Sequence, residues 1–445
     1  MNTLGGFLTI ILCIVAGTAP RRYAALAYVA SMLYVTQAQM IDLGLFMTAL
    51  RFVEVTAFLR ICVRGELSAV QFSKVDRWLL IFFGTSEVVS VLRTGIVDTY
   101  ALGVVVDGAL VYFTFRALIQ DVDDFIGFMK GMSMLLIPFA ILILMESLSG
   151  RNGFSSMGGV PELSVFRDGH VRCSGSFRSA IGAGSFGASF VALFACFMFD
   201  SRTRGWGLVG TGLSLFIVIC SRSSGPLLAA ITACAAWACW GFRYRMRVVR
   251  WTIVSTLAGL QLVMKAPVWF IFDRVSGVIG GDGWARSNLI DKFLRHFQEW
   301  WLMGMPIQDT GDWAATRMPW GGVDVTDYYV SIGINGGLIS LVFFVILLKQ
   351  CYQLIGRGLE AVRSDPERDP FDEMILWGLG CTVCVHMVNF FSVVYWDQSY
   401  AAWYLQVAAA VSLSQSMLNP RFVPVIEEES ESFEGAPVLN VPNRT

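Results

Sequence analysis

The sequence predicts an all-α membrane protein, a single polytopic bundle of about 12 to 14 helices that cross the lipid bilayer. Two observations support this prediction. Of the 445 residues, 55% are hydrophobic and only 15% are charged, whereas soluble proteins carry roughly 25% charged residues; the mean hydropathy is +0.60. The apolar residues also gather in long runs that alternate with short polar connections. Because lipid offers no partners to backbone groups, runs of this length are expected to form helices.

The apolar runs themselves indicate where the helices lie, since a span needs about 20 such residues. The runs centre on residues 4–19, 23–40, 42–60, 78–93, 99–118, 131–148, 183–199, 205–220, 225–242, 251–271, 329–348, 374–395 and 398–416. The first run has the length of a signal peptide but no basic residues before it, so we expect it to remain as a span. We predict one membrane domain over residues 1–419 and a glutamate-rich, disordered cytoplasmic tail over 420–445.

The basic residues of the connections indicate which end of the bundle faces the cytoplasm. Every second connection is rich in them: Arg21 and Arg22; Arg60, Arg64, Lys74 and Arg77; Arg116 and Lys130; Arg202 and Arg204; Arg243, Arg245, Arg247 and Arg250; Lys349, Arg357, Arg363 and Arg368. The alternate short connections carry little beyond Arg93 and Arg222. By the positive-inside rule the first set is cytoplasmic, so the long loops 149–182 and 272–328 and the turn 221–225 face outward.

Composition also limits the chemistry that we expect. The net charge is −1, which gives no indication of nucleic-acid binding, and we predict no nucleic acid among the partners. Most of the ten cysteines lie in apolar runs, so no disulfide framework is expected. The histidines, His170, His296 and His386, do not combine with cysteines at zinc-binding spacing. The sequence therefore predicts neither a metal nor a cofactor.

The second outward loop contains an expected amphipathic helix between residues 285 and 303. Its apolar residues recur at spacings of three and four from Leu289 to Trp301, and its charged residues fall mostly on the other side. The segment is too charged to cross a membrane, so we expect it at the membrane surface or over the mouth of the bundle. An ordinary cover helix and a helix that grips a substrate both fit this pattern.

Three arginines are expected at the outward mouth of the bundle. Arg178 immediately precedes an apolar run, Arg222 lies in the tight turn, and Arg286 opens the amphipathic segment. Arginine suits phosphate because its planar fork donates two charge-assisted hydrogen bonds. Outward arginines in tight turns also oppose the topology rule, so each needs a reason. Interfacial snorkelling or a structural ion pair explains any one of them at least as well.

The order of these pieces resembles the O-antigen ligase and O-antigen polymerase superfamily of bacterial inner-membrane proteins. The matching pieces, in order, are RSAIGAGSFG from Arg178, CSRSSGPLLA from Cys220, WARSNLIDKF from Trp284, WWLMGM from Trp300 and DYYVSIGINGGL from Asp327. Each piece alone is weakly specific, and the resemblance depends on their order and spacing over about residues 170–348.

The resemblance implies a glycan transferase at the periplasmic face of the bacterial inner (cytoplasmic) membrane. It would act in the biosynthesis of surface polysaccharide, such as lipopolysaccharide or exopolysaccharide. Such proteins move a glycan from a polyprenyl (undecaprenyl) diphosphate carrier to an acceptor hydroxyl, which lies on lipid A-core for ligases and on a carrier-linked repeat for polymerases. They require no metal and no nucleotide sugar. On this mapping Arg178 and Arg222 bind the diphosphate and stabilise charge on the leaving group, and Arg286 supports them.

The sequence departs from the family where the acceptor would be activated. Ligases usually carry a histidine before the last periplasmic helix entry, where this chain has Thr326 and Asp327. Asp327 is the candidate general base, since a carboxylate can accept the hydroxyl proton, although aspartate at this point is also a good helix N-cap. Asp324 and His296 are the other candidates. The departure favours a polymerase or another capsule-type transferase over an orthodox ligase.

Ionisable residues inside the apolar runs suggest further roles. Lys265 lies near the outward end of its run and either faces the phosphate site or snorkels. Arg51 and Glu54 are one turn apart and are expected to pair on one helix. The competing functions are a transporter or flippase for a lipid-linked sugar, and then a non-catalytic scaffold. Transporters usually show paired halves and helices broken at mid-membrane, whereas the unusual features here gather at one face, which favours a one-sided catalytic site.

Overall fold

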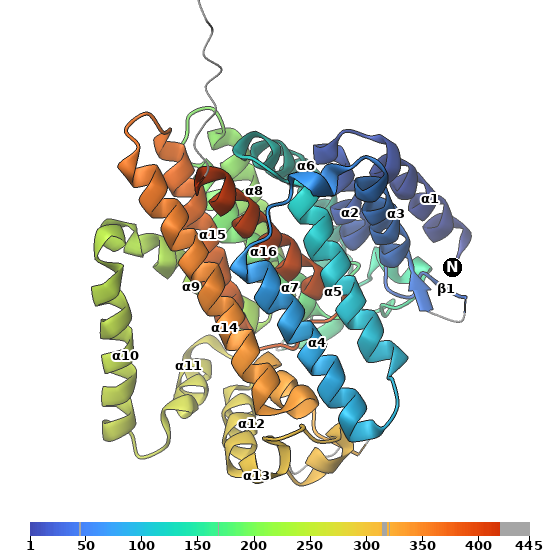
Figure 1. Cartoon of the computed structure of the whole chain (residues 1–445). Helices are drawn as coiled ribbons and strands as arrows, with labels where there is room; N and C mark the ends of the chain where they lie inside the picture. The colour runs from blue at the N-terminus through green and yellow to red at the C-terminus, as the bar shows by residue number, and fades with distance from the viewer. Residues whose placement is uncertain (44–45, 168, 314–317, 320, 419–445) are drawn as a thin grey trace, which may run out of the picture.

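The computed structural model describes residues 1–43, 46–167, 169–313, 318–319 and 321–418 (Figure 1). Helices dominate, and the strands of this part form only two short hairpins, so the all-α prediction is confirmed. Seven of the described helices have the length and apolar composition to cross a membrane, which supports a multi-pass membrane protein. The finer count of about 12 to 14 spans stays a prediction. The predicted tail, 420–445, lies outside the described residues.

The helices follow one another closely along the chain. They are α1 (Thr3–Thr18), α2 (Arg21–Tyr34), α3 (Ala49–Val63), α4 (Lys74–Thr94), α5 (Thr99–Leu118), α6 (Val122–Ser149), α7 (Ala180–Phe197), α8 (Arg204–Ser221), α9 (Ser224–Ala238), α10 (Met246–Val263), α11 (Ile271–Ile279), α12 (Gly283–Arg295), α13 (Phe297–Trp300), α14 (Tyr328–Ser364), α15 (Pro370–Asn389) and α16 (Asp397–Leu418). Short 3₁₀ turns fill several connections: η1 (Glu66–Ala69), η2 (Gly153–Met157), η3 (Cys239–Arg245), η4 (Val268–Phe270) and η5 (Ile307–Trp313).

Two antiparallel hairpins occupy connections between the helices. Strands β1 (Met40–Asp42) and β2 (Phe46–Thr48) pair just before α3, and β3 (Val165–Arg167) pairs with β4 (His170–Arg172) in the first long loop. The first hairpin takes up the start of the run 42–60, so the helix there begins later than the apolar pattern suggested.

The core lies where α7, α15 and α16 meet. Every residue of α7 from Ala183 to Phe194 is buried, and α16 is buried along almost its whole length. Small residues allow this close approach, which is typical of membrane helices: a Cβ on Gly187 would lie 2.8 Å from the carbonyl oxygen of Ser214 in α8. Aromatic rings fill the remaining space around Phe390, at the end of α15.

α14 is interrupted near its start at Gly337. This glycine has φ 68° and ψ −175°, a conformation that residues with a side chain adopt only with strain. The segment after α13 docks into the break, where the Met305 N–H donates to the Ile334 carbonyl at 2.8 Å. Arg93 donates to the same carbonyl at 3.0 Å. The second long loop is thereby tied to the spanning helices, and Arg93 has a structural role.

The amphipathic segment forms a helix in two pieces. α12 ends at Arg295, and His296, with φ −89° and ψ 22°, separates it from α13. The break turns the chain so that the rings of Phe293 and Trp300 stack, with centroids 3.9 Å apart. Both rings belong to a small core that covers the first turns of α14. The position over the bundle agrees with the expectation, but the expectation of one continuous helix is wrong at His296.

Figure 1 shows the connections α1–α2, α7–α8 and α14–α15 at the end of the bundle opposite α11–α13, whereas α10 begins well below that end. Lys349 lies inside α14 and not in a connection.

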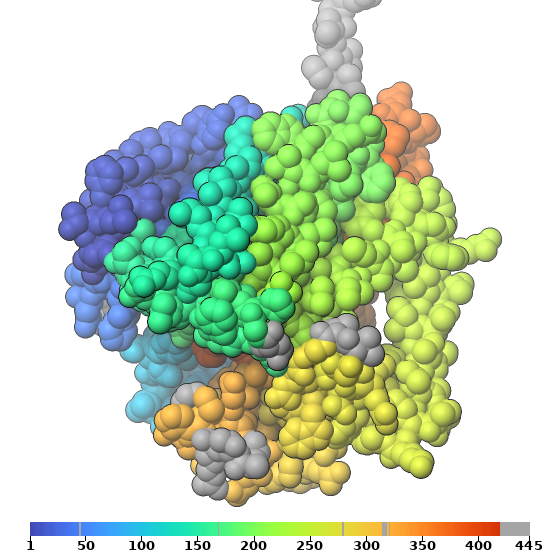
Figure 2. Space-filling view, turned by 180° about the vertical axis from the view of Figure 1, so that it is seen from behind, coloured from blue at the N-terminus to red at the C-terminus, as the bar shows by residue number. Residues whose placement is uncertain are grey.

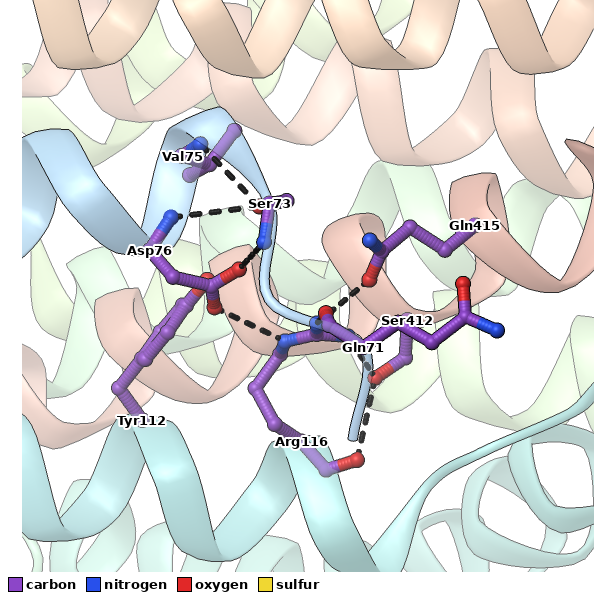
Figure 3. A network of polar contacts seen from close by, with 8 residues as sticks. All are labelled: Gln71, Ser73, Val75, Asp76, Tyr112, Arg116, Ser412 and Gln415. Atoms are coloured by element: carbon purple, nitrogen blue, oxygen red, sulfur yellow. Dashed lines mark hydrogen bonds and ion pairs between the residues drawn. The ribbon is translucent and has the colours of Figure 1, made fainter. Parts of the chain in front are cut away.

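A buried network ties three helices together (Figure 3). Arg116 of α5 forms an ion pair with Asp76 of α4 at 3.2 Å and donates to the Ser412 hydroxyl of α16 at 2.9 Å. The Tyr112 hydroxyl donates to Asp76 at 2.8 Å, and the guanidinium also binds the Gln71 carbonyl at 2.6 Å. The pair is therefore fully hydrogen-bonded, as burial of charge requires.

The expected pair of Arg51 with Glu54 is wrong. The Arg51 guanidinium donates from Nε to both oxygens of Asp107 on α5 at 2.9 Å. Glu54 lies instead beside the hydroxyl of Tyr28 on α2, at 3.4 Å. The spacing of Arg51 and Glu54 along one helix would allow a pair. Asp107 on the neighbouring helix instead accepts two hydrogen bonds from the guanidinium, which is a stronger arrangement than a single contact.

Candidate functional site

The turn between α8 and α9 places Arg222 at the end of the bundle that also carries α11–α13, here called the loop end. Arg222 follows the last residue of α8 and adopts the left-handed conformation, with φ 46° and ψ 43°. Its side chain is exposed, while Ser221 and Ser223 on either side are buried. This conformation costs a residue with a side chain about 1–2 kcal/mol, and such strain is often found at functional sites.

Two further arginines reach the same turn. Arg286 of α12 donates from Nη1 to the hydroxyl of Ser224 at 3.3 Å. Arg172 of β4 donates from Nη2 to the hydroxyl of Ser223 at 2.8 Å. Arg172, Arg222 and Arg286 are called the arginine cluster below. Sequence reasoning predicted Arg222 and Arg286 but missed Arg172, whose only signal was its place in the first long loop.

The arginine cluster carries positive charge without an ion-pair partner among the described residues. Burial lowers the pKa of Arg286; Asp282 opposes this shift, and nearby Arg167 adds to it. Burial also lowers the pKa of Arg172, whose Nε atom is buried without a hydrogen-bond partner. Both guanidiniums have lost hydration, and no carboxylate of the described residues forms an ion pair with either of them. A phosphate group would supply the missing acceptors and charge, so the arrangement can bind a diphosphate.

Arg178 has a carboxylate partner, unlike the arginine cluster. Its Nη2 atom lies 3.0 Å from Oδ2 of Asp397, the first residue of α16, and its side chain is 63% exposed. Asp397 has φ 49°, and it shares a left-handed backbone only with Arg222 among the described non-glycine residues. Sequence reasoning missed Asp397; the available signal was one carboxylate in the short connection between the last two apolar runs.

Asp327 caps α14 and is deeply buried. Its Oδ1 atom accepts a hydrogen bond from the Val330 N–H at 3.0 Å, which confirms the N-cap interpretation. The residue is 1% exposed, and its Oδ2 atom has no partner among the described residues. Burial raises the pKa of Asp327 to about 7, against the opposing effect of the backbone N–H groups of Val330 and Tyr329. A carboxyl group with this pKa and a free oxygen can act as a general base.

The connection between α15 and α16, residues 390–396, and the first residue of α16 link these features. The first residue of the connection, Phe390, accepts a hydrogen bond from the Tyr328 N–H, next to the buried cap, at 2.7 Å. Ser392 packs against the turn of the arginine cluster: a Cβ on Gly225 would lie 2.6 Å from its Cβ. Asp397 directly follows the connection and forms the ion pair with Arg178, just before α7. One short segment therefore contacts all three parts of the candidate site.

A buried polar network fixes this connection in the core. His386 Nε2 lies 2.6 Å from the amide oxygen of Gln406, and Nδ1 lies 2.7 Å from the Tyr395 hydroxyl. Because an amide oxygen only accepts, Nε2 carries the proton and Nδ1 accepts from Tyr395. The Tyr395 oxygen accepts in turn from the Asn389 amide at 2.9 Å, and Gln406 donates to Ser189 at 3.1 Å. The only sequence signal for this network was one histidine within an apolar run.

The remaining predicted site residues lie outside these contacts. His296 Nδ1 lies 2.7 Å from Oε1 of Glu299, and the ring stacks on Trp313 with centroids 5.4 Å apart. Asp324 and Lys265 are exposed. Their roles in substrate binding stay predictions.

A scan against models of protein families and a search of curated proteins found no match to this chain. Within the described ranges, no group of three or more His, Cys, Asp or Glu residues could hold a metal ion. The function is therefore inferred from the residues and their geometry.

Proposed function

We propose that this protein is a membrane glycan transferase of the O-antigen ligase or polymerase type. It takes its donor from a polyprenyl diphosphate-linked glycan and acts at the periplasmic face of the inner membrane. The observation that supports this most is the arginine cluster, in which the guanidiniums of Arg172 and Arg286 bind the turn that carries Arg222 and none of the three has an ion-pair partner among the described residues. A diphosphate supplies both the counter-charge and the paired oxygens that a guanidinium fork binds.

In the proposed reaction one bond forms and one breaks. The oxygen of an acceptor hydroxyl attacks the anomeric carbon of the donor glycan, and the bond from that carbon to the diphosphate oxygen breaks. The diphosphate leaves with the electron pair, and the arginine cluster stabilises the charge that develops on it. The hydroxyl proton passes to Asp327, whose unpartnered Oδ2 oxygen supports this role.

Arg178 is proposed to contact the same diphosphate from the other side of the α15–α16 connection. Asp397 engages one of its nitrogens, which leaves other donors of the guanidinium for a ligand. The ion pair also restricts the side chain, so less rotamer freedom is lost when the ligand binds.

A transporter or flippase for a lipid-linked sugar is the second candidate, because α14 is broken at Gly337. Broken helices are a feature of many transporters. Here, however, the second long loop fills the break with hydrogen bonds to the freed carbonyl. This filling favours a structural role for the break and a fixed site at the loop end.

The test is reconstitution of the full chain in proteoliposomes with a polyprenyl diphosphate-linked oligosaccharide as donor. We expect a new glycosidic bond and release of polyprenyl diphosphate. The Arg222→Lys variant serves as the matched control, because it keeps the charge but loses the fork. Movement of the intact donor between leaflets without a new bond would replace the transferase proposal with the flippase.

A further inference from the structure

Two cysteines meet beside the arginine cluster. Cys173 directly follows Arg172, and Cys220 lies two residues before Arg222. The Cys173 N–H donates to the Cys220 carbonyl at 3.0 Å, which satisfies one of the carbonyls that a helix leaves free at its C-terminal end. Figure 2 shows the first long loop, in blue-green, on the surface beside the brighter green of α8. The loop and the helix are therefore joined where the arginine cluster assembles.

The two thiols lie side by side. The side chains of Cys173 and Cys220 form a hydrogen bond with each other, and the two residues are only 1% and 8% exposed. Backbone partners in a sheet have α-carbons about 4.5–5.5 Å apart, and a disulfide spans roughly 4.4–6.8 Å. Both residues are free thiols in this structure, but their backbone contact and their adjacent sulfur atoms give the placement that a disulfide requires.

The segment after β4 is held by a buried carboxylate and a buried amide. Glu146, near the end of α6, accepts hydrogen bonds from the Ser174 N–H at 3.0 Å and from the Gly175 N–H at 2.9 Å. The Asn152 amide donates to the Ser174 hydroxyl at 3.1 Å and to the Gly175 carbonyl at 2.8 Å. The other cysteine belongs to the last turn of α8. Because both backbones are held, the two sulfur atoms are kept together by the fold.

We propose that Cys173 and Cys220 form a disulfide bond, which fastens the first long loop to the end of α8. This inference rests on the periplasmic placement of the loop end in the proposed function, because disulfides persist in the periplasm and are rare in the cytosol. It does not depend on the transferase activity. The bond holds Arg172 beside the turn of Arg222, so less freedom is lost when an anion binds the arginine cluster.

The bond forms by exchange with an incoming disulfide, which is carried by a periplasmic thiol oxidase or by oxidised glutathione. One thiolate of the pair attacks a sulfur of that disulfide, and the other sulfur of the oxidant leaves as a thiolate. The second thiolate of the pair then attacks the protein sulfur of the mixed disulfide and releases the rest of the oxidant. The pair loses two electrons and two protons, and the oxidant gains them as two thiols. Because both cysteines are buried in the folded protein, the exchange takes place before the loop docks.

The experiment measures the thiol state of the full chain in the bacterial membrane. Membranes are dissolved in denaturant with N-ethylmaleimide, which blocks free thiols, and the protein is then reduced and treated with deuterated N-ethylmaleimide. Peptide mass spectrometry should find the deuterated label on Cys173 and Cys220. The light label on both residues would overturn the proposal, because it would show that they are free thiols in the membrane.

Cys381 and Cys384 provide the matched control within the same chain. They are one turn apart on α15 and close enough to interact, but they lie inside an apolar helix that has the composition of a membrane span. We expect the light label on both. Deuterated label on this pair as well would reject the proposed bond as a product of oxidation during preparation.

Thermal unfolding of the purified protein separates a bond from simple packing. Cys173→Ser, Cys220→Ser and the double variant should lower the unfolding midpoint by the same amount, several degrees, because the loss of either sulfur removes the whole bond. If the shifts of the two single variants add up in the double variant, the two side chains contribute independently and the proposal is overturned.

These measurements also separate the inference from the proposed function. If the protein is no transferase, the deuterated label on the two cysteines persists while no glycosidic bond forms in the reconstituted assay. If the protein is a transferase without this disulfide, transfer takes place while both cysteines carry the light label.

Discussion

Replacement of Asp327 by asparagine should have opposite effects on stability and on activity. Asparagine caps a helix about as well as aspartate, so the hydrogen bond to the Val330 N–H is kept. The pKa of Asp327 is raised from an ordinary value of 3.8 to about 7. A carboxyl group whose pKa is raised on folding stabilises the fold fully only at a pH below its pKa in the unfolded state. This contribution is lost as the pH rises through its pKa in the folded state.

The magnitude follows from that shift. A rise of about three pKa units, at 1.36 kcal/mol per unit, makes the wild type about 4 kcal/mol less stable at pH 8 than at a low pH where Asp327 is protonated in both states. At pH 5 only the unfolded state is largely ionised, and the loss is about 2 kcal/mol. Because the residue is 1% exposed, solvent screens little of this. The Asp327→Asn protein lacks the ionisable group, so its advantage in the free energy of unfolding should grow from pH 5 to pH 8. Unfolding of detergent-purified proteins at both pH values measures the difference.

The rate of glycan transfer should fall in the same variant. The asparagine variant cannot take the acceptor proton, so its rate should fall by roughly a hundredfold or more. The wild-type rate should rise through pH 7 as the carboxyl ionises, and the variant should lose this rise. The control is Asp98→Asn, an exposed N-cap at α5, for which we expect neither effect. Near-normal transfer by Asp327→Asn, or a stability difference that is the same at both pH values, would refute the reasoning and leave Asp327 as a cap alone.

Four further predictions test the fold and the arginine cluster. Arg222→Gly should relieve about 1 kcal/mol of backbone strain and raise the unfolding temperature while transfer is lost; a stable, fully active variant would remove Arg222 from the site. Gly337→Ala should destabilise the protein by several kcal/mol, because its φ is 68° and the new Cβ would lie 2.7 Å from a carbonyl oxygen. The matched Gly212→Ala, whose Cβ meets nothing within 4 Å, should stabilise it by about 0.5–1 kcal/mol. Asp76→Asn should cost about 3–5 kcal/mol, because a guanidinium would stay buried without its counter-charge; a thermal midpoint like that of the wild type would contradict this. A cysteine at Gln308, an exposed residue of the second long loop, in a background without native cysteines, should react with an impermeant maleimide only from the periplasmic side, and reaction only from the cytoplasm would reverse the topology.

The sequence by itself determined the class of the molecule and the ends of many helices. Apolar composition and long apolar runs predict membrane helices because burial in lipid depends on residues that are neighbours in the chain. The cap at Asp327 was also readable, since a cap and the N–H groups that it binds lie within one turn. The amphipathic face of α12 was predicted for the same reason, because it depends on local spacing.

The tertiary structure alone decided which charged groups meet. Arg172 and Arg286 reach serines 51 and 62 residues away in the sequence, and Arg178 finds its carboxylate on the last helix. Arg51 pairs with Asp107 on another helix and not with Glu54 on its own helix. No local pattern encodes such contacts, because they depend on which helices pack side by side. The pKa of Asp327 shows the same limit: burial raises it and the backbone N–H groups of Val330 and Tyr329 lower it, and only the packing around α14 decides that burial prevails.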